Sequence, residues 1–305
     1  GQASMAYVGK VPWHGLGVEV PDNTSAMDMM ALAGCDWKVT KLDSFVEHEG
    51  KKVPAGTQAL VRDVDGKVLT QVGPNWNPVQ NSEAFEFFHE FVEAGKMTMH
   101  TAGSLQDGGI VWALAKVEDD FTLFNGDRVE SFLLFSNPHQ YGKTITVRFT
   151  PIRVVCNNTL TLSLSQKAGN QVKLNHRHKF DADQVKTTLG IAHLKMAQYR
   201  LMADHLGSKR YTPITLGEYL TKLFGTKTGT NGDLTRTGET VAELVKTQPG
   251  ANFAEGTWWS AYNAVSYWTD HVAGRNADTR LQSAWYGTNQ KKKVEALELA
   301  LEYAD

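Results

Sequence analysis

The spacing of apolar residues changes near residue 181, and this change constrains the fold of the chain more than any other feature. Before it, short β-prone runs alternate with turn residues, at 36–48, 59–72, 97–104, 110–117, 130–136 and 144–149. After it, helical spacing recurs at 181–206, 215–224, 239–246, 257–271, 278–286 and 290–303. Strands followed by helices predict an α+β fold, with a mixed, mainly antiparallel sheet in the N-terminal half and a helical C-terminal half.

Two local patterns refine the strand-rich half. Phenylalanines recur at helical spacing in 83–94, Asn81 and Ser82 can cap the start of this helix, and Gly95 follows at its end. The dipeptide Asp65-Gly66 lies between two β-prone runs and is typical of a tight hairpin turn. We therefore expect a hairpin followed by one helix packed on the sheet.

The pattern divides the chain into two regions. We predict a sheet-rich α+β core over 1–180 and a helical region over 181–305, and the 41% of hydrophobic residues are enough for a sizeable core. Pro151 should end the strand at 144–149. The stretch 225–238 is rich in Gly and Thr and has almost no large apolar residue, so it is predicted to be a flexible loop.

Aromatic residues are dense in the helical region. Trp258, Tyr262 and Val265, with either Trp268 or Val272, fall on one helical stripe, which favours packing in the core over an oligomer contact or a base-stacking platform. The cluster comprises Trp258, Trp259, Tyr262, Tyr267, Trp268, Trp285 and Tyr286.

Cysteine content and apolar run length bear on the compartment. Cys35 and Cys156 are too few for a disulfide framework or a multi-Cys metal site, which favours a reducing cytoplasm. Apolar runs such as 132–135 are far too short to span a bilayer, and no charged-then-apolar leader opens the sequence. We therefore expect a cytoplasmic protein with no membrane association.

Charge is segregated along the chain although the formal net charge is only −2. Residues 1–130 hold ten Lys/Arg and nineteen Asp/Glu, whereas 131–180 holds seven Lys/Arg and no acid, and 181–305 holds fourteen of each. One interpretation is a cationic surface that binds a polyanion, and the other is a buried strand region in which acids are scarce. Within 144–149, alternation places Thr144, Thr146 and Arg148 on one face and the apolar residues on the other.

The sequence carries no strong catalytic motif. Gly142-Lys143-Thr144 resembles the end of a phosphate-binding loop, but Asn137 stands where that loop needs Gly, and a strand rather than a helix follows. There is no Gly-x-Ser-x-Gly or His-Glu-x-x-His motif, and Cys156 in an apolar run is more typical of a small buried residue than of a nucleophile. We assign no catalytic residue, no metal ligand, no cofactor and no small-molecule substrate.

The candidate binding residues are cationic or polar side chains in or next to the acid-free segment. Guanidinium, ammonium and amide groups contact phosphate oxygens without preference for base sequence, and His residues add charge at low pH. Asn157 is equally suited to a turn. The predicted set is Lys143, Arg148, Arg153, Asn157, Lys173, His176, Arg177 and Lys179.

Several segments carry a resemblance to a known family. They include Pro12-Trp13-His14-Gly15-Leu16-Gly17, the run 151–160, Arg177-His178 and Asp270-His271. On these segments the chain resembles a phage- and plasmid-borne family of unknown function associated with lateral gene transfer, with one departure at Lys179, where a Thr is expected. In outline it is also similar, more distantly, to single-strand annealing recombinases, which have a β-β-β-α core with a basic groove and form oligomers.

The resemblance and the charge pattern together imply a function. We expect a non-enzymatic protein that binds and anneals single-stranded DNA in recombination or replication, forms a homo-oligomer and acts in the cytoplasm of a bacterial host. The acidic 1–130 segment of one subunit could complement the basic segment of the next in a head-to-tail assembly. The alternatives are a metal-assisted nuclease or hydrolase built on His139, His176 and His178, and a structural or anti-defence interaction protein of a phage.

Overall fold

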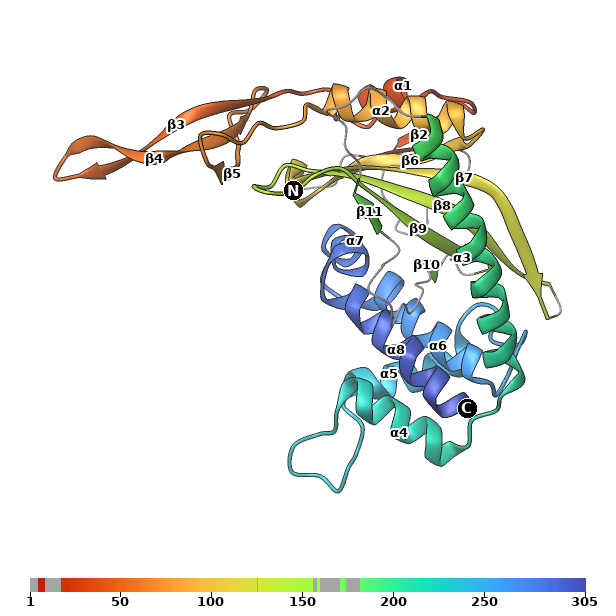
Figure 1. Ribbon diagram of the computed structural model, residues 1–305. Coiled ribbons are helices and arrows are strands. Elements are labelled where there is room, and N and C mark those ends of the chain that lie inside the picture. Colours follow the sequence, from red (N-terminus) through yellow and green to blue (C-terminus); the bar gives the residue numbers. More distant parts are fainter. Residues whose placement is uncertain (1–4, 9–17, 125, 156–157, 160–170, 174–181) are drawn as a thin grey trace.

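A large central sheet organises the molecule (Figure 1). The computed structural model describes residues 5–8, 18–124, 126–155, 158–159, 171–173 and 182–305. The sheet has eight strands in the order β10-β9-β8-β7-β6-β1-β2, with β11 also paired to β9. They span β1 Met5–Val8, β2 Val18–Val20, β6 Thr98–Leu105, β7 Ile110–Leu123, β8 Asp127–Pro138, β9 Thr146–Arg153, β10 Asn158–Thr159 and β11 Gln171–Lys173.

Most strand pairs of this sheet are antiparallel. Strands β6, β7, β8 and β9 form a continuous meander, and among the described strands only β1 and β2 pair in parallel. Short connections between neighbouring strands produce this topology, because antiparallel strands need no crossover. The predicted mixed, mainly antiparallel sheet is confirmed.

The alternation of residues along the strands gives the sheet two buried faces. On one face, Val147 and Phe149 join the main core, which α1 (Ala26–Leu32), α2 (Asn81–Ala94) and α3 (Ala182–Ser208) cover. On the other face, a smaller core gathers residues such as Trp112 and Leu134 against α7 (Ala277–Tyr286). The predicted division of 144–149 into an apolar face and a polar, cationic face is therefore correct.

Helix α2 packs its phenylalanines on the sheet. Its start is capped at Gln80, one residue before the predicted caps, where the Gln80 side chain and Glu83 form a capping box. Phe88 and Phe91 are buried, and both ring centroids lie 5.1 Å from that of Phe135. Burial of such aromatic side chains is a main source of stability.

A second, three-stranded sheet projects from the body (Figure 1). It consists of β3 Val39–His48, β4 Lys51–Arg62 and β5 Val68–Val72, paired antiparallel in that order. We call it the arm. Asp65-Gly66 lies in the turn between β4 and β5, as predicted, and Gly66 has φ +71°. The two-residue type I′ turn that this dipeptide favours is not formed, because the connection spans residues 63–67 and Asp65 does not adopt a positive φ.

The prediction that Pro151 ends its strand is wrong. Strand β9 continues to Arg153, and Pro151 lies opposite Ser131 of β8. On its other edge, β9 pairs with β11 at residues 146–148 and with β10 at 152–153. Among the described pairings, Pro151 thus lies between the residues of β9 that pair with β11 and those that pair with β10. Its missing N–H therefore removes no hydrogen bond from either pairing.

The helical half follows the predicted order. It comprises α4 Pro213–Phe224, α5 Arg236–Thr247, α6 Trp258–Tyr267, a π-helical turn at Trp268–Val272, α7 and α8 Thr288–Ala304. Trp258, Trp259 and Tyr262 of α6 are buried in the main core, as expected, whereas Tyr267 at the end of α6 is only half-buried. Between α4 and α5 the backbone forms a bridge from Thr226 to Leu234, and α5 already begins at Arg236, so the loop is shorter than predicted.

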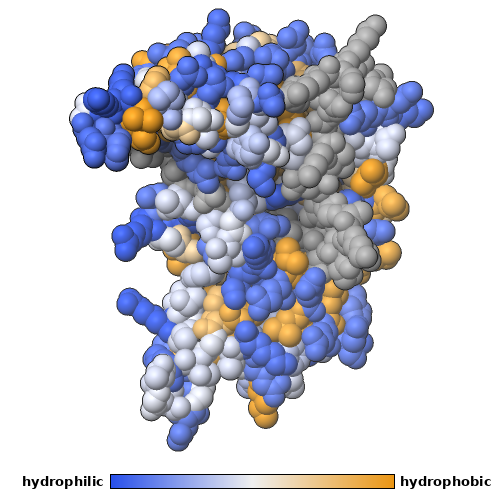
Figure 2. All heavy atoms as spheres, turned by 60° about the vertical axis from the view of Figure 1, so that its left-hand side comes forward, coloured by the Kyte–Doolittle hydropathy of each residue, from blue (hydrophilic) through white to orange (hydrophobic). Residues whose placement is uncertain are grey.

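On the face shown in Figure 2 the surface is largely hydrophilic, with scattered hydrophobic patches. In the ranges that the structure describes, no helix combines the length and the apolar character needed to cross a bilayer.

Two glycines allow a matched test of backbone conformation. A Cβ on Gly190, in the middle of α3, meets nothing within 4 Å, so G190A should raise the free energy of unfolding by about 0.5–1 kcal/mol. At Gly225, which caps α4, a Cβ would meet only Thr235 Cγ2, at 3.9 Å, but the backbone has φ +78° and ψ −173°, a conformation almost restricted to Gly, so G225A should lower the free energy of unfolding by about 1–3 kcal/mol. Urea denaturation measures both, and equal effects of the two substitutions would contradict the assigned conformations.

Candidate anion-binding pocket

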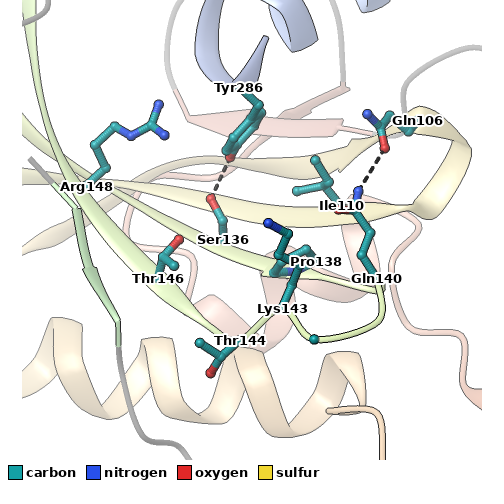
Figure 3. A pocket seen from close by; sticks show the side chains of 11 residues that line it. Gln106, Ile110, Ser136, Pro138, Gln140, Lys143, Thr144, Thr146, Arg148 and Tyr286 are labelled. Carbon is teal, nitrogen blue, oxygen red and sulfur yellow. Dashed lines mark hydrogen bonds between the residues drawn. The ribbon is translucent and has the colours of Figure 1, made fainter. Parts of the chain in front are cut away.

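A pocket of about 370 Å³ opens on the sheet face that carries α7 (Figure 3). It lies where β8 turns into β9, and Tyr286 at the end of α7 forms its opposite wall. The lining residues come from β7, β8, β9, α7 and two turns: Gln106, Ile110, Ser136, Pro138, Gln140, Gly142, Lys143, Thr144, Thr146, Arg148 and Tyr286.

The turn between β8 and β9 brings Lys143 to the pocket. The Lys143 N–H donates to the carbonyl of Gln140 at 3.1 Å, and Gly142 adopts φ +74°, a conformation that favours glycine. The Gln140 amide in turn donates to Gln106 Oε1 at 3.2 Å, which ties this turn to the one before β7. The Lys143 side chain is exposed and belongs to the pocket wall.

Arg148 is held in place by α7. Its guanidinium donates to the carbonyl of Trp285 and lies 5.5 Å from the ring centroid of Tyr286. Burial lowers the pKa of Arg148, but a guanidinium keeps its charge at any physiological pH. The pocket therefore contains a partly buried, oriented cation.

A hydroxyl pair lies next to this cation. The Tyr286 hydroxyl and Ser136 Oγ are 2.6 Å apart, and the dashed line in Figure 3 marks this hydrogen bond. Burial raises the pKa of Tyr286 to about 12, so its phenol is neutral at pH 7. Hydroxyls of Thr144 and Thr146 complete a wall of neutral hydrogen-bonding groups.

The electrostatics of the pocket favour an anion. Among the described lining residues two are cations, Lys143 and Arg148, and none is Asp or Glu. Lys293 is buried and forms a 3.0 Å ion pair with Asp270. Its pKa is lowered mainly by burial, and the positive charge of Arg148 lowers it further by a smaller amount. Two cations and several hydroxyl donors without a carboxylate suit a phosphate-like oxyanion.

The structure brings together only part of the predicted binding set. Lys143 and Arg148 line one pocket, as shown in Figure 3. Lys173 belongs to β11, whose backbone pairs with β9 at Thr146, but its side chain is outside the described part of the structure. Four other members also lie outside the described residues: Asn157, His176, Arg177 and Lys179.

The assignment of Arg153 to the binding set needs correction. Its side chain is 1% exposed, and its Nε and Nη2 donate to Asp127 at 2.9–3.0 Å while Nη2 also donates to the carbonyl of Gly250. Trp259 Nε1 donates to the same carboxylate at 2.9 Å. Such a buried guanidinium has no surface to offer a phosphate, so Arg153 is a structural residue.

The alternation of the strand explains this outcome. Arg153 follows Arg148 by five positions on β9, an odd offset, so their side chains point to opposite faces of the sheet. That signal is present in the sequence. The partner Asp127 carries no such signal, because only the β8–β9 register places the two residues together.

The metal-site alternative also finds no support at His139. This side chain is buried, its Nε2 lies 2.7 Å from Asn81 Oδ1, and its ring centroid lies 5.5 Å from that of Trp37. Burial lowers the pKa of His139 to about 4. No group of three or more His, Cys, Asp or Glu in the described residues could hold a metal, and His176 and His178 lie outside those residues.

Fold and pocket together define an α+β protein with a cationic, oxyanion-compatible pocket between a sheet and a helix. Comparison with known proteins identifies the family. The model of the domain of unknown function DUF932 matches residues 68–285, and the chain belongs to this family. No curated protein and no solved structure matched the chain.

The buried ion pair predicts a large loss of stability in one variant. D127A should lower the free energy of unfolding by about 3–5 kcal/mol, because it leaves the buried Arg153 without its carboxylate. The neighbouring R128A is the control, since Arg128 forms exposed ion pairs and its loss should change stability far less than D127A does. Urea denaturation at pH 7 measures both, and similar effects would contradict the structural role.

The buried His139 predicts a pH effect. Its pKa is about 4 in the folded state and about 6.5 in the unfolded state, so the unfolded state binds more protons between these values. Stability from this group is complete above pH 6.5 and falls by about 3 kcal/mol as pH falls to 4. In H139Q this part of the pH dependence should vanish, as measured by urea denaturation across that range. An unchanged pH profile would contradict the assignment.

Proposed function

We propose that this protein binds single-stranded DNA through its phosphates, without covalent chemistry, in the recombination or replication of a phage or plasmid. The observation that supports this most is the pocket wall formed by Arg148 and Lys143, which offers two cations and no carboxylate among its described lining. Sequence-independent binding of a nucleic acid strand needs such phosphate contacts first.

The dimensions of the pocket limit what it holds. About 370 Å³ corresponds to the lower end of small-ligand pockets, which fits one phosphate with its sugar rather than a whole strand. Arg148, oriented from the sheet face, would hold that phosphate, and the exposed Lys143 would contact the strand as it leaves the pocket. The acid-free segment on either side of β9 would continue the contact along the chain.

Because Arg153 is buried, the proposed phosphate contacts are limited to one face of β9. Phosphate contacts in the described residues come from the even-numbered face of β9 and the β8–β9 turn, and not from the odd-numbered face that packs in the core. The binding surface is thus one-sided. The resemblance to a mobile-element family supports the proposed biological setting, since such elements need proteins that hold single strands.

The salt dependence of binding tests the proposal. Each phosphate contact on a single strand adds about 0.7 to the slope of log affinity against log salt. K143A should therefore weaken binding of a fluorescein-labelled oligo-thymidine and reduce this slope by about 0.7, as measured by fluorescence anisotropy. K51A, at the turn of the arm between β3 and β4, removes an exposed charge elsewhere and should leave both unchanged.

Two outcomes would reject strand binding. The first is an absence of binding at low salt, and the second is a slope that K143A and K51A change equally. Thymidine monophosphate is the competing ligand. If it bound as tightly as the oligonucleotide, the pocket would recognise a single nucleotide and the proposed contact with a strand would be wrong.

A further inference from the structure

The outer part of the arm is a two-stranded ribbon. Strand β5 pairs only with residues 58–61 of β4, so residues 43–57 of the β3–β4 hairpin pair with each other alone among the described strands. A two-stranded hairpin is marginally stable in water unless another strand or a helix covers it. Among the described strands, the outer part of the hairpin therefore lacks the third strand that would stabilise it.

Apolar side chains are exposed along the same ribbon. Leu42, Phe45 and Val46 of β3 are 51%, 49% and 53% exposed, and Val53 of β4 is 39% exposed. In Figure 2, where the arm comes forward at the upper left, hydrophobic surface interrupts the hydrophilic surface there. Leu42, Val46 and Val53 lie on one face of the ribbon and Phe45 on the other, so both faces expose apolar side chains. Exposed apolar residues on a projecting strand pair are typical of an interaction surface.

The two edges of the ribbon are not equally open. On β4, Pro54 lacks an N–H, and the register shift between Asp43 and Phe45 places a bulge at 55–57 with Gly56 at φ +78°. Proline and bulges are the devices with which proteins protect an edge from pairing. On β3, residues 40–48 include neither Pro nor Gly, and the hydrogen bonds from Gln80 to the backbone end at Val39.

We propose that two copies of this chain pair through the β3 edges of their arms, antiparallel and about a two-fold axis at Ser44. In this register Lys41 lies opposite Glu47 of the second copy, and Leu42 lies opposite Val46. Shifting the axis to Phe45 would instead place Asp43 opposite Glu47, two like charges. An axis at Leu42 would also pair opposite charges, Lys41 with Asp43, but only over residues 39–45, whereas the axis at Ser44 pairs residues 40–48. Charge complementarity and the length of paired strand together favour a second copy in the register centred on Ser44.

The contact is isologous, because the same strand is used on both sides, and it closes as a dimer. It differs from the head-to-tail assembly expected from the charge pattern. It would give a continuous sheet from β5 of one copy to β5 of the other, which supplies the ribbon with its missing neighbour. The proposal is independent of the proposed DNA binding, and its test contains no nucleic acid.

Charge reversal tests the register. K41E or E47K alone places like charges opposite each other twice in the dimer, and each should weaken dimerisation about ten-fold or more in sedimentation equilibrium. The double variant K41E/E47K restores both pairs and should dimerise like the wild type. An equimolar mixture of the two single variants should form a heterodimer, because their charges complement each other across the axis.

Controls separate the interface from local effects. Lys41 Nζ also donates to the carbonyl of Pro74 at 2.9 Å, a contact that K41E and the double variant both lose, so recovery in the double variant isolates the pairing. K51E lies outside β3 and should not change dimerisation. A wild-type protein that stays monomeric at all concentrations, or a dimer indifferent to the single reversals, would overturn the proposal.

Discussion

A buried ion pair between Arg153 and Asp127, at neighbouring ends of two strands, anchors contacts from the helical half on the central sheet. Both side chains are almost fully buried, and the pair is completed by the Trp259 indole of α6 and the carbonyl of Gly250. The Asp127 carboxylate thus accepts hydrogen bonds from Arg153 of the sheet and from Trp259 of α6, and Arg153 also donates to the loop that contains Gly250. Because an unpaired charge in the interior is strongly unfavourable, loss of either partner would be costly, and the pair anchors Trp259 and the Gly250 loop at the start of β8 and the end of β9.

The same strand that supplies this pair also supplies the pocket. Alternation along β9 sends Val147 and Arg153 toward the main core and Thr146 and Arg148 toward α7. Two arginines five positions apart thus have different environments: Arg153 forms a buried ion pair, and Arg148 lines the pocket. The acid-free segment of the sequence contains both kinds of cation, so its positive charge overstates the charge that can face a ligand.

Local periodicity predicted much of this architecture, because it reports which face of an element is buried. It located α2, α3 and the helices that follow, and it divided 144–149 correctly between core and polar face. Contacts between distant segments were not predictable in this way. Pro151 inside a strand depends on where the edge strands β10 and β11 pair, and the approach of Tyr286 to Ser136 depends on how α7 docks across 150 residues of sequence.

The hydrogen bond from Arg148 to Trp285 couples the pocket to the docking of a helix. That carbonyl belongs to the last turn of α7, the negative end of the helix dipole, which the guanidinium partly neutralises. An anion in the pocket would interact with the same guanidinium and would therefore compete with the Trp285 carbonyl for it. An anion that weakened the hydrogen bond to Trp285 would weaken the docking of α7, and by thermodynamic reciprocity release of α7 would then raise the affinity for the anion by the same factor.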